Sequence, residues 1–268
     1  MIPALVPNAR KARSILVALA VGAAASLAAC APRTVSLAEG PREYVPFDYD
    51  QILKRWTRTD SLVALAELDD LLTVTATFES WDFRWAYVVR YADDYRLTVD
   101  QRKSILESTL AESRKQHQFY VALYGPNRRW NDLSKKSSAW VVRLIDDKGN
   151  ETAPAEIVSI PRPGAIERTY FPYTSVWRQA FRIRFPVRHD DGRTTIAPDA
   201  RWFGLRFAGA QGHQDLLWLV DPAGERPPSP APSGPAAPPS PPPESGGAKE
   251  IAEGGPPFVR PPARVGRY

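Results

Sequence analysis

The chain has 268 residues and a formal charge of +5 at pH 7, from 35 Lys and Arg against 30 Asp and Glu. Three of the basic residues precede Cys30 in a stretch without acids, so the chain beyond has a charge of only +2. A balance this small gives no case for binding nucleic acid. The length suits one large or two small domains, and the single cysteine excludes an internal disulfide.

The N-terminus has the organisation of an export signal. Arg10, Lys11 and Arg13 precede an uncharged apolar run over residues 15–29. A basic segment, a short apolar segment and small residues at its end are the parts of a secretory signal. The run is shorter than the roughly 20 residues of a membrane-spanning helix. A transmembrane helix and an ordinary signal peptide are the alternatives.

The apolar run closes on Leu27-Ala28-Ala29-Cys30, which resembles the lipobox of bacterial lipoproteins; the resemblance covers residues 1–30. It implies removal of residues 1–29, a thioether-linked diacylglycerol on the Cys30 sulfur, and an acyl chain such as palmitate on its amino group. Several acyl chains make a permanent anchor, since each buried methylene contributes about 0.8 kcal/mol. Ala31 is not the aspartate associated with inner-membrane retention in lipoproteins. The resemblance therefore implies an outer-membrane location facing the periplasm.

Composition divides the remaining chain into three parts. Residues 30–46 are predicted to form a polar tether that reaches about 50 Å when extended. Residues 47–220 are predicted to form the folded domain. Residues 221–268 hold more than half of the 27 prolines and few apolar residues, which predicts a disordered, partly polyproline tail.

The first part of the domain alternates between helical and extended patterns. A short helix is predicted over residues 49–58, and a strand over residues 70–78, where apolar residues alternate with threonines. Helical spacing follows over residues 80–116, where Thr98 and Gln101 resemble a capping box that starts a second helix. We expect a helical hairpin that packs against the sheet, inserted after the first strand.

Alternation with a period of two returns in the second part of the domain. Strands are predicted over residues 119–123, 140–144, 155–160, 181–187, 203–207 and 217–219, with turn sequences between most of them. About seven strands indicate a mainly β, α+β fold, an immunoglobulin-like β-sandwich. The Cys–Trp–Cys pattern of true immunoglobulin domains is absent, so the likeness concerns architecture only.

Motifs that would indicate an enzyme are missing from the sequence. There is no Gly-x-Ser-x-Gly elbow, phosphate-binding loop, dinucleotide fingerprint or His-Glu-x-x-His motif. We therefore expect no catalysis and no cofactor besides the acyl groups on Cys30. His189, Asp191 and His213 would meet as metal ligands only if two turns lie at one end of the sandwich. Solvated turn histidines are the commoner case.

Eight tryptophans are an unusual number for this length. Trp81, Trp85 and Trp140 are predicted to lie in the core. Other aromatic residues fall in loop-like stretches close to arginines, as expected of a recognition surface. The candidate residues are Trp130, Asn131, Tyr173, Trp177 and Arg178. The alternative is that these loops fold back and close the ends of the sandwich.

The sequence thus favours a non-catalytic, membrane-anchored lipoprotein of the bacterial envelope. Its expected role is that of a scaffold or accessory subunit that docks to another envelope protein. The alternative is a module that binds peptidoglycan or another glycan through its loop aromatics. An enzyme of unrecognised type is the third and weakest hypothesis.

Overall fold

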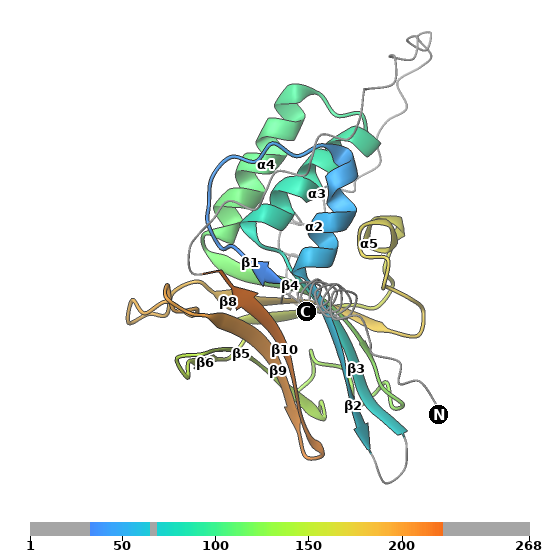
Figure 1. Ribbon diagram of the computed structural model, residues 1–268. Helices are drawn as coiled ribbons and strands as arrows, with labels where there is room; N and C mark the ends of the chain where they lie inside the picture. Colours follow the sequence, from blue (N-terminus) through green and yellow to red (C-terminus); the bar gives the residue numbers. More distant parts are fainter. Residues whose placement is uncertain (1–32, 65–68, 222–268) are drawn as a thin grey trace, which may run out of the picture. The chain divides into compact units, whose positions relative to one another are not determined.

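The computed structural model describes residues 33–64 and 69–221 (Figure 1). The predicted signal segment, Cys30 and the tail beyond Asp221 lie outside the described residues. The described residues from Thr34 onward belong to one compact unit. None of its described helices combines the length and the apolar character needed to cross a bilayer.

Ten strands within the described residues form two five-stranded sheets (Figure 1). Sheet A contains, in spatial order, β1 (Thr34–Val35), β10 (Gly212–Val220), β9 (Trp202–Gly209), β5 (Trp140–Asp146) and β6 (Glu151–Thr152). Sheet B contains β2 (Thr57–Ala64), β3 (Asp69–Phe78), β4 (Gln116–Tyr124), β8 (Gln179–Pro186) and β7 (Glu156–Ile160). Strands β1 and β10 are parallel, and the other paired neighbours are antiparallel. The prediction of a mainly β, α+β sandwich is confirmed.

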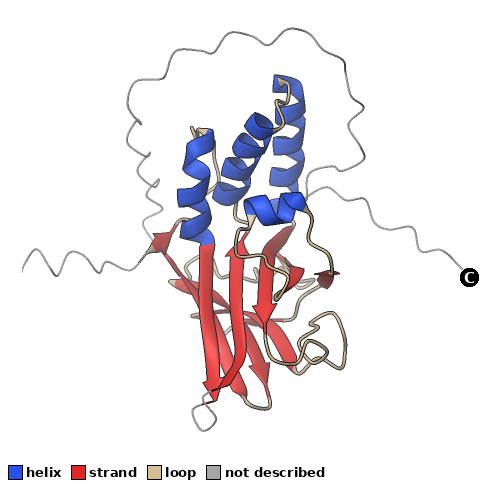
Figure 2. Cartoon of the chain, turned by 90° about the vertical axis from the view of Figure 1, so that its right-hand side faces the viewer, coloured by secondary structure: helices blue, strands red, loops and turns tan. Residues whose placement is uncertain are grey.

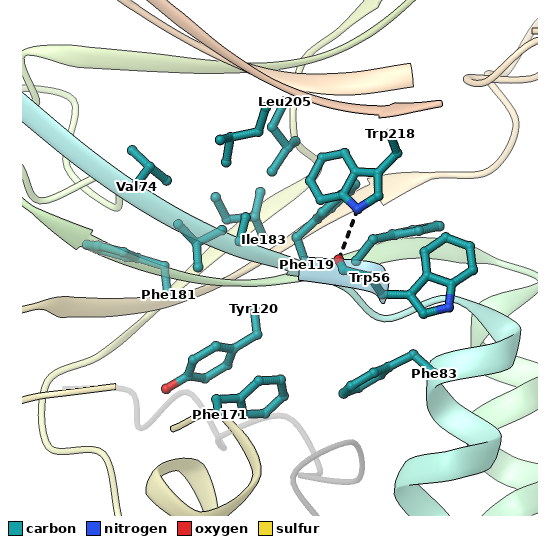
Figure 3. Packing of buried hydrophobic residues seen from close by; sticks show 14 of the residues in the cluster. Trp56, Val74, Phe83, Phe119, Tyr120, Phe171, Phe181, Ile183, Leu205 and Trp218 are labelled. Atoms are coloured by element: carbon teal, nitrogen blue, oxygen red, sulfur yellow. Dashed lines mark hydrogen bonds between the residues drawn. The ribbon is translucent and has the colours of Figure 1, made fainter. Parts of the chain in front are cut away.

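Apolar residues at alternate positions of both sheets fill the space between them (Figure 3). The rings of Phe78 and Phe203 lie 5.1 Å apart, and those of Phe119 and Trp218 lie 5.6 Å apart. The Trp218 indole also donates a hydrogen bond of 2.9 Å to the carbonyl of Trp56. Truncating a buried phenylalanine of this kind to alanine costs about 3–5 kcal/mol. The pattern of alternating apolar residues therefore identified the inner face of the sandwich correctly.

Figure 2 shows the helices gathered at one end of the strands. They are the 3-10 helix η2 (Pro46–Asp48) and the α-helices α2 (Tyr49–Trp56), α3 (Trp81–Asp94), α4 (Val99–Ser113) and α5 (Ala165–Tyr170). The predicted helical hairpin corresponds to α3 and α4. The predicted capping box is also present: the backbone N–H of Gln101 donates to Thr98 Oγ1, and the backbone N–H of Thr98 donates to Gln101 Oε1. The hairpin follows β3, the third strand along the chain, and not the first strand as expected.

Strand β2 was not predicted from the sequence. Its alternate positions carry hydroxyl groups in place of apolar side chains, so the usual sign of a half-buried strand is missing. The hydroxyls of Thr57 and Thr77 lie 2.7 Å apart, and Thr59–Thr75 and Ser61–Thr73 each lie 3.0 Å apart. Side-chain hydrogen bonds across β2 and β3 thus take the place of apolar contacts on this face.

Residues 34–44, which we call the N-terminal strap, are bound to the fold along their length. The strap begins as β1, where Val35 is buried in the core. Further on, Trp81 Nε1 donates a hydrogen bond of 2.7 Å to the carbonyl of Gly40. The described part of the predicted polar tether over residues 30–46 therefore contacts the fold.

The last residues of the strap contact Asp82, a buried carboxylate near the start of α3. Asp82 accepts hydrogen bonds from Arg42 Nε at 3.0 Å and from the Tyr44 hydroxyl. It also accepts one from Trp56 Nε1 at 3.0 Å, at the end of α2. A buried carboxylate needs several such donors to offset the loss of water. Asp82 thereby joins the strap to two helices.

Candidate functional site

Two tryptophans are highly exposed on loops next to sheet B. Trp130 lies in the loop between β4 and β5 and is 59% exposed, and Trp177 lies between α5 and β8 and is 74% exposed. Val176, beside Trp177, is 62% exposed. A contiguous apolar patch on a protein surface often marks a binding site, so these exposed side chains on neighbouring loops are the candidate site. We call Trp130, Val176 and Trp177 the tryptophan surface.

Hydrogen bonds fix the loops that carry these side chains. Arg128 Nη1 donates a hydrogen bond of 3.0 Å to the carbonyl of Val176 and so joins one loop to the other. The carbonyl of Trp130 accepts a 2.7 Å hydrogen bond from the amide of Ala139. The tryptophan surface is therefore held by the backbone of both loops, with its indole rings free to make contacts.

Asn131 and Tyr173, two of the predicted recognition residues, support the fold instead. Asn131 is buried, and its Oδ1 accepts a 2.9 Å hydrogen bond from Trp140 Nε1. The Tyr173 hydroxyl lies 2.7 Å from Thr77 Oγ1, and burial raises the pKa of this phenol well above its usual value. The sequence could not separate these residues from their exposed neighbours, because all of them lie in loops of similar composition.

Arg178, the fifth predicted recognition residue, positions the loop. Its Nη1 donates a hydrogen bond of 2.7 Å to Thr75 Oγ1 on β3. This contact fixes the backbone next to Trp177.

Of the predicted core tryptophans, Trp140 is buried, whereas Trp81 and Trp85 are only partly buried.

The structure does not bring the predicted metal ligands together. His189 Nε2 lies 3.1 Å from Thr152 Oγ1 on β6, whereas His213 lies on β10, three strands away in sheet A. At the usual strand spacing that separation is about 14 Å. Asp191 pairs with Arg193 at 2.7 Å. Among the described residues, no three histidine, cysteine, aspartate or glutamate side chains form a group that could hold a metal ion.

A buried group of charged residues was missed in the sequence. Glu79 lies between β3 and α3, and Arg84 of α3 is equally buried. Arg182 Nε of β8 lies 3.7 Å from Glu79 Oε1, and Gln118 Nε2 donates a hydrogen bond to Glu79 Oε2. Burial raises the pKa of Glu79, while Arg182 and Arg84 act to lower it. Glu79 and Arg84 are buried and Arg182 is partly exposed, and the group connects α3 to sheet B.

Comparisons with known proteins identify no relative with an assigned role. No family model and no curated protein matches the chain. The chain is similar to a crystal structure of a protein of unknown function from Burkholderia pseudomallei K96243. The two share 12% identity at a TM-score of 0.34, over 67% of this chain and 90% of the other. A likeness at this level gives no support to any function.

Proposed function

We propose that this chain is a non-catalytic lipoprotein of the bacterial cell envelope that docks to another envelope protein as a scaffold or accessory subunit. The docking role rests on one observation: Trp130 and Trp177 are exposed on two loops that the Arg128–Val176 hydrogen bond joins. The anchor rests on the resemblance of Leu27 to Cys30 to a lipobox. Acyl groups on Cys30 would hold the protein in the outer membrane, facing the periplasm.

The residue types of the tryptophan surface favour a protein partner. Tryptophan and arginine are enriched among the residues that dominate binding energy at protein interfaces. Here Arg128 and Arg129 directly precede Trp130 in the same loop, and both are exposed. Because hydrogen bonds already fix the loops, less conformational entropy is lost on binding. A few rigid aromatic anchors of this kind can support specific docking over a small area.

A peptidoglycan- or glycan-binding module is the second candidate, and the same two exposed indole rings favour it. The sequence interpretation gave this module a third ring, Tyr173. That ring packs near Tyr120 and Phe171, with centroids 6.0 and 6.2 Å away. A sugar would therefore stack on Trp130 and Trp177 alone.

Cross-linking in intact cells of the native host tests the docking role. A photoreactive amino acid at Arg129 should capture one reproducible envelope protein. Trp130→Ala combined with Trp177→Ala should reduce that product at least tenfold, because both anchors are lost.

Phe47→Ala is the matched control, since Phe47 is 81% exposed but lies in η2. It should leave the cross-linked product unchanged. Capture of no reproducible protein would refute the docking role, and sedimentation with purified peptidoglycan that depends on Trp130 and Trp177 would favour the second candidate. Acyl labelling that persists in Cys30→Ala would refute the anchor.

A further inference from the structure

The described fold begins very close to the proposed lipid anchor. Only residues 31–33 lie between Cys30 and Thr34, the first residue of β1. Four residue steps span at most about 14 Å. The N-terminal strap cannot lengthen this connection, because Val35 is buried and β1 pairs with β10.

The outer face of sheet A is apolar next to β1. Thr34 pairs with Leu219, and Leu219 pairs with Trp202, so these residues form a row across three strands. Their side chains point away from the core, because the alternate residues Phe203 and Trp218 are buried inside. Leu219 and Trp202 are both partly exposed.

The next outward position on β10 extends this apolar row. Leu217 is 40% exposed and lies over Gly204 of β9, where an added Cβ would come within 2.7 Å of Leu217 Cδ2. Along the strands of a sheet with one face in water, apolar side chains usually point into the core and polar side chains point into the solvent. An outward face with Trp202, Leu217 and Leu219 departs from that rule. We call these three residues the outer apolar row.

We propose that the outer apolar row lies against the lipid bilayer surface, so that sheet A rests directly on the membrane. This inference rests on the proposed anchor at Cys30. The short connection brings the row to the lipid, and apolar and tryptophan side chains are suited to the region of the headgroups. The short connection from Cys30 favours lipid as the occupant, since Thr34, at the anchored end of β1, pairs with Leu219 of the outer apolar row.

Fluorescence quenching in vesicles tests this placement. Because acylation uses the native thiol, a dye on Leu217→Cys labels a single site of the full-length lipidated protein. In phosphatidylethanolamine–phosphatidylglycerol vesicles with a nitroxide near the headgroups, this dye should be quenched at least threefold more than one on Val158→Cys. Val158 is 39% exposed on β7 of sheet B, which makes it a matched control. Twelve Gly and Ser residues inserted between Ala31 and Pro32 should reduce the difference, because they add a flexible span of about 20 Å.

Flotation of the same samples separates the two proposals. If the wild-type protein floats with the vesicles, Cys30→Ala does not, and both dyes are quenched equally, the placement is wrong and the anchor stands. Shielding of the Leu217→Cys dye from aqueous iodide without quenching by the lipid nitroxide would also overturn the placement, since a protein would then cover the row. If the wild-type protein fails to float, the anchor fails and the placement fails with it.

Discussion

The outer faces of the two sheets differ in how far other elements bury them. On sheet B the outer side chains of Thr77, Gln118 and Tyr120 are buried beneath the helices and the segment before β8. The ring of Phe171 stacks on Tyr120 with centroids 3.9 Å apart (Figure 3). On sheet A the outer apolar row keeps part of its surface exposed. Polar residues are thus buried on one sheet while apolar residues are exposed on the other.

This contrast shows that a strand pattern predicts which residues share a face but does not predict whether that face is exposed to water. Alternation indicates which residues share a face, because successive side chains point to opposite sides. Whether a face meets water depends on elements elsewhere in the chain. On sheet B, polar residues are covered because each finds a partner in the covering layer. On sheet A, Leu217 is exposed and Trp202 and Leu219 are partly exposed, which leaves part of the outer apolar row available for binding.

The largest effect is expected from breaking the buried charged group of sheet B. Arg84→Met removes the hydrogen bonds of the guanidinium to the carbonyls of Glu79 and Thr109, at 2.9 and 3.1 Å. Loss of one partner from a buried charged group should lower the free energy of unfolding by about 3–5 kcal/mol. Denaturant unfolding measures the loss. Arg90→Met, on the same helix and paired with Asp94 near the surface, should cost less than about 1 kcal/mol. Equal costs for both variants would show that the covering layer does not depend on this group.

The next effect concerns His117, which packs against Phe78 with ring centroids 5.7 Å apart. Burial and the nearby Arg84 lower its pKa to about 4. Below pH 6.5 the unfolded chain takes up a proton that the folded protein does not, so stability is present above that pH and falls toward pH 4. Linkage gives a loss of about 2 kcal/mol at pH 5. Unfolding measured from pH 8 to pH 4.5 should show this loss, and His117→Gln should flatten it. An unchanged pH profile in that variant would contradict the assignment.

A smaller effect is expected within the hydroxyl pairs of β2 and β3. Thr77→Val keeps the shape of the side chain but removes its contacts with the hydroxyls of Thr57 and Tyr173. It should lower the thermal unfolding midpoint by an amount that corresponds to about 1 kcal/mol, because the Tyr173 hydroxyl then keeps only its long hydrogen bond of 3.4 Å to the carbonyl of Tyr120. Thr73→Val removes a hydroxyl that lies 3.0 Å from that of Ser61 near the surface; it serves as the control and should change stability by about 0.5 kcal/mol or less. A larger loss of stability from Thr73→Val than from Thr77→Val would contradict this prediction.

The smallest effect should follow changes in the outer apolar row. Leu217→Ser should alter the free energy of unfolding by about 0.5 kcal/mol or less, since its side chain is already partly in water. Leu216→Ser, one residue earlier and buried between the sheets, should cost several kcal/mol. Chemical denaturation of both variants measures the difference. A large loss from Leu217→Ser would mean that this residue supports the fold and is not free to bind.

The sequence predicted those elements whose two faces differ in polarity. Strand β8 is the best case, because Phe181, Ile183 and Phe185 lie in the core as their spacing indicated. The same pattern failed to predict that Arg182 would be covered, since its neighbours Glu79 and Tyr120 come from other elements. Helix α5 was missed because only six residues form it, too few for a periodic signal.

The candidate site was predicted only in part for a related reason. Trp130 and Trp177 are exposed as the loop composition indicated, but Asn131 and Tyr173 in the same loops point inward. Loop residues lack the periodicity that tells the two directions apart in a strand. The contact that joins the loops, from Arg128 to the backbone of Val176, spans 48 positions. Long-range contacts of this kind are not visible in a single sequence.

The parallel pairing of β1 with β10 determines how the fold would carry mechanical load. Thr34 lies beside Leu219, and the amide of Asp221 donates a hydrogen bond of 2.9 Å to the carbonyl of Val35. A pull applied between Thr34 and Asp221 acts along both strands in opposite directions, so these backbone bonds are loaded in shear. Once they give way, tension passes along residues 36–38 to a second junction, formed by the ion pair of Glu39 with Arg114, the hydrogen bond of Trp81 to Gly40 and the ion pair of Arg42 with Asp82. The rest of the sandwich would stay unstretched until that second junction breaks.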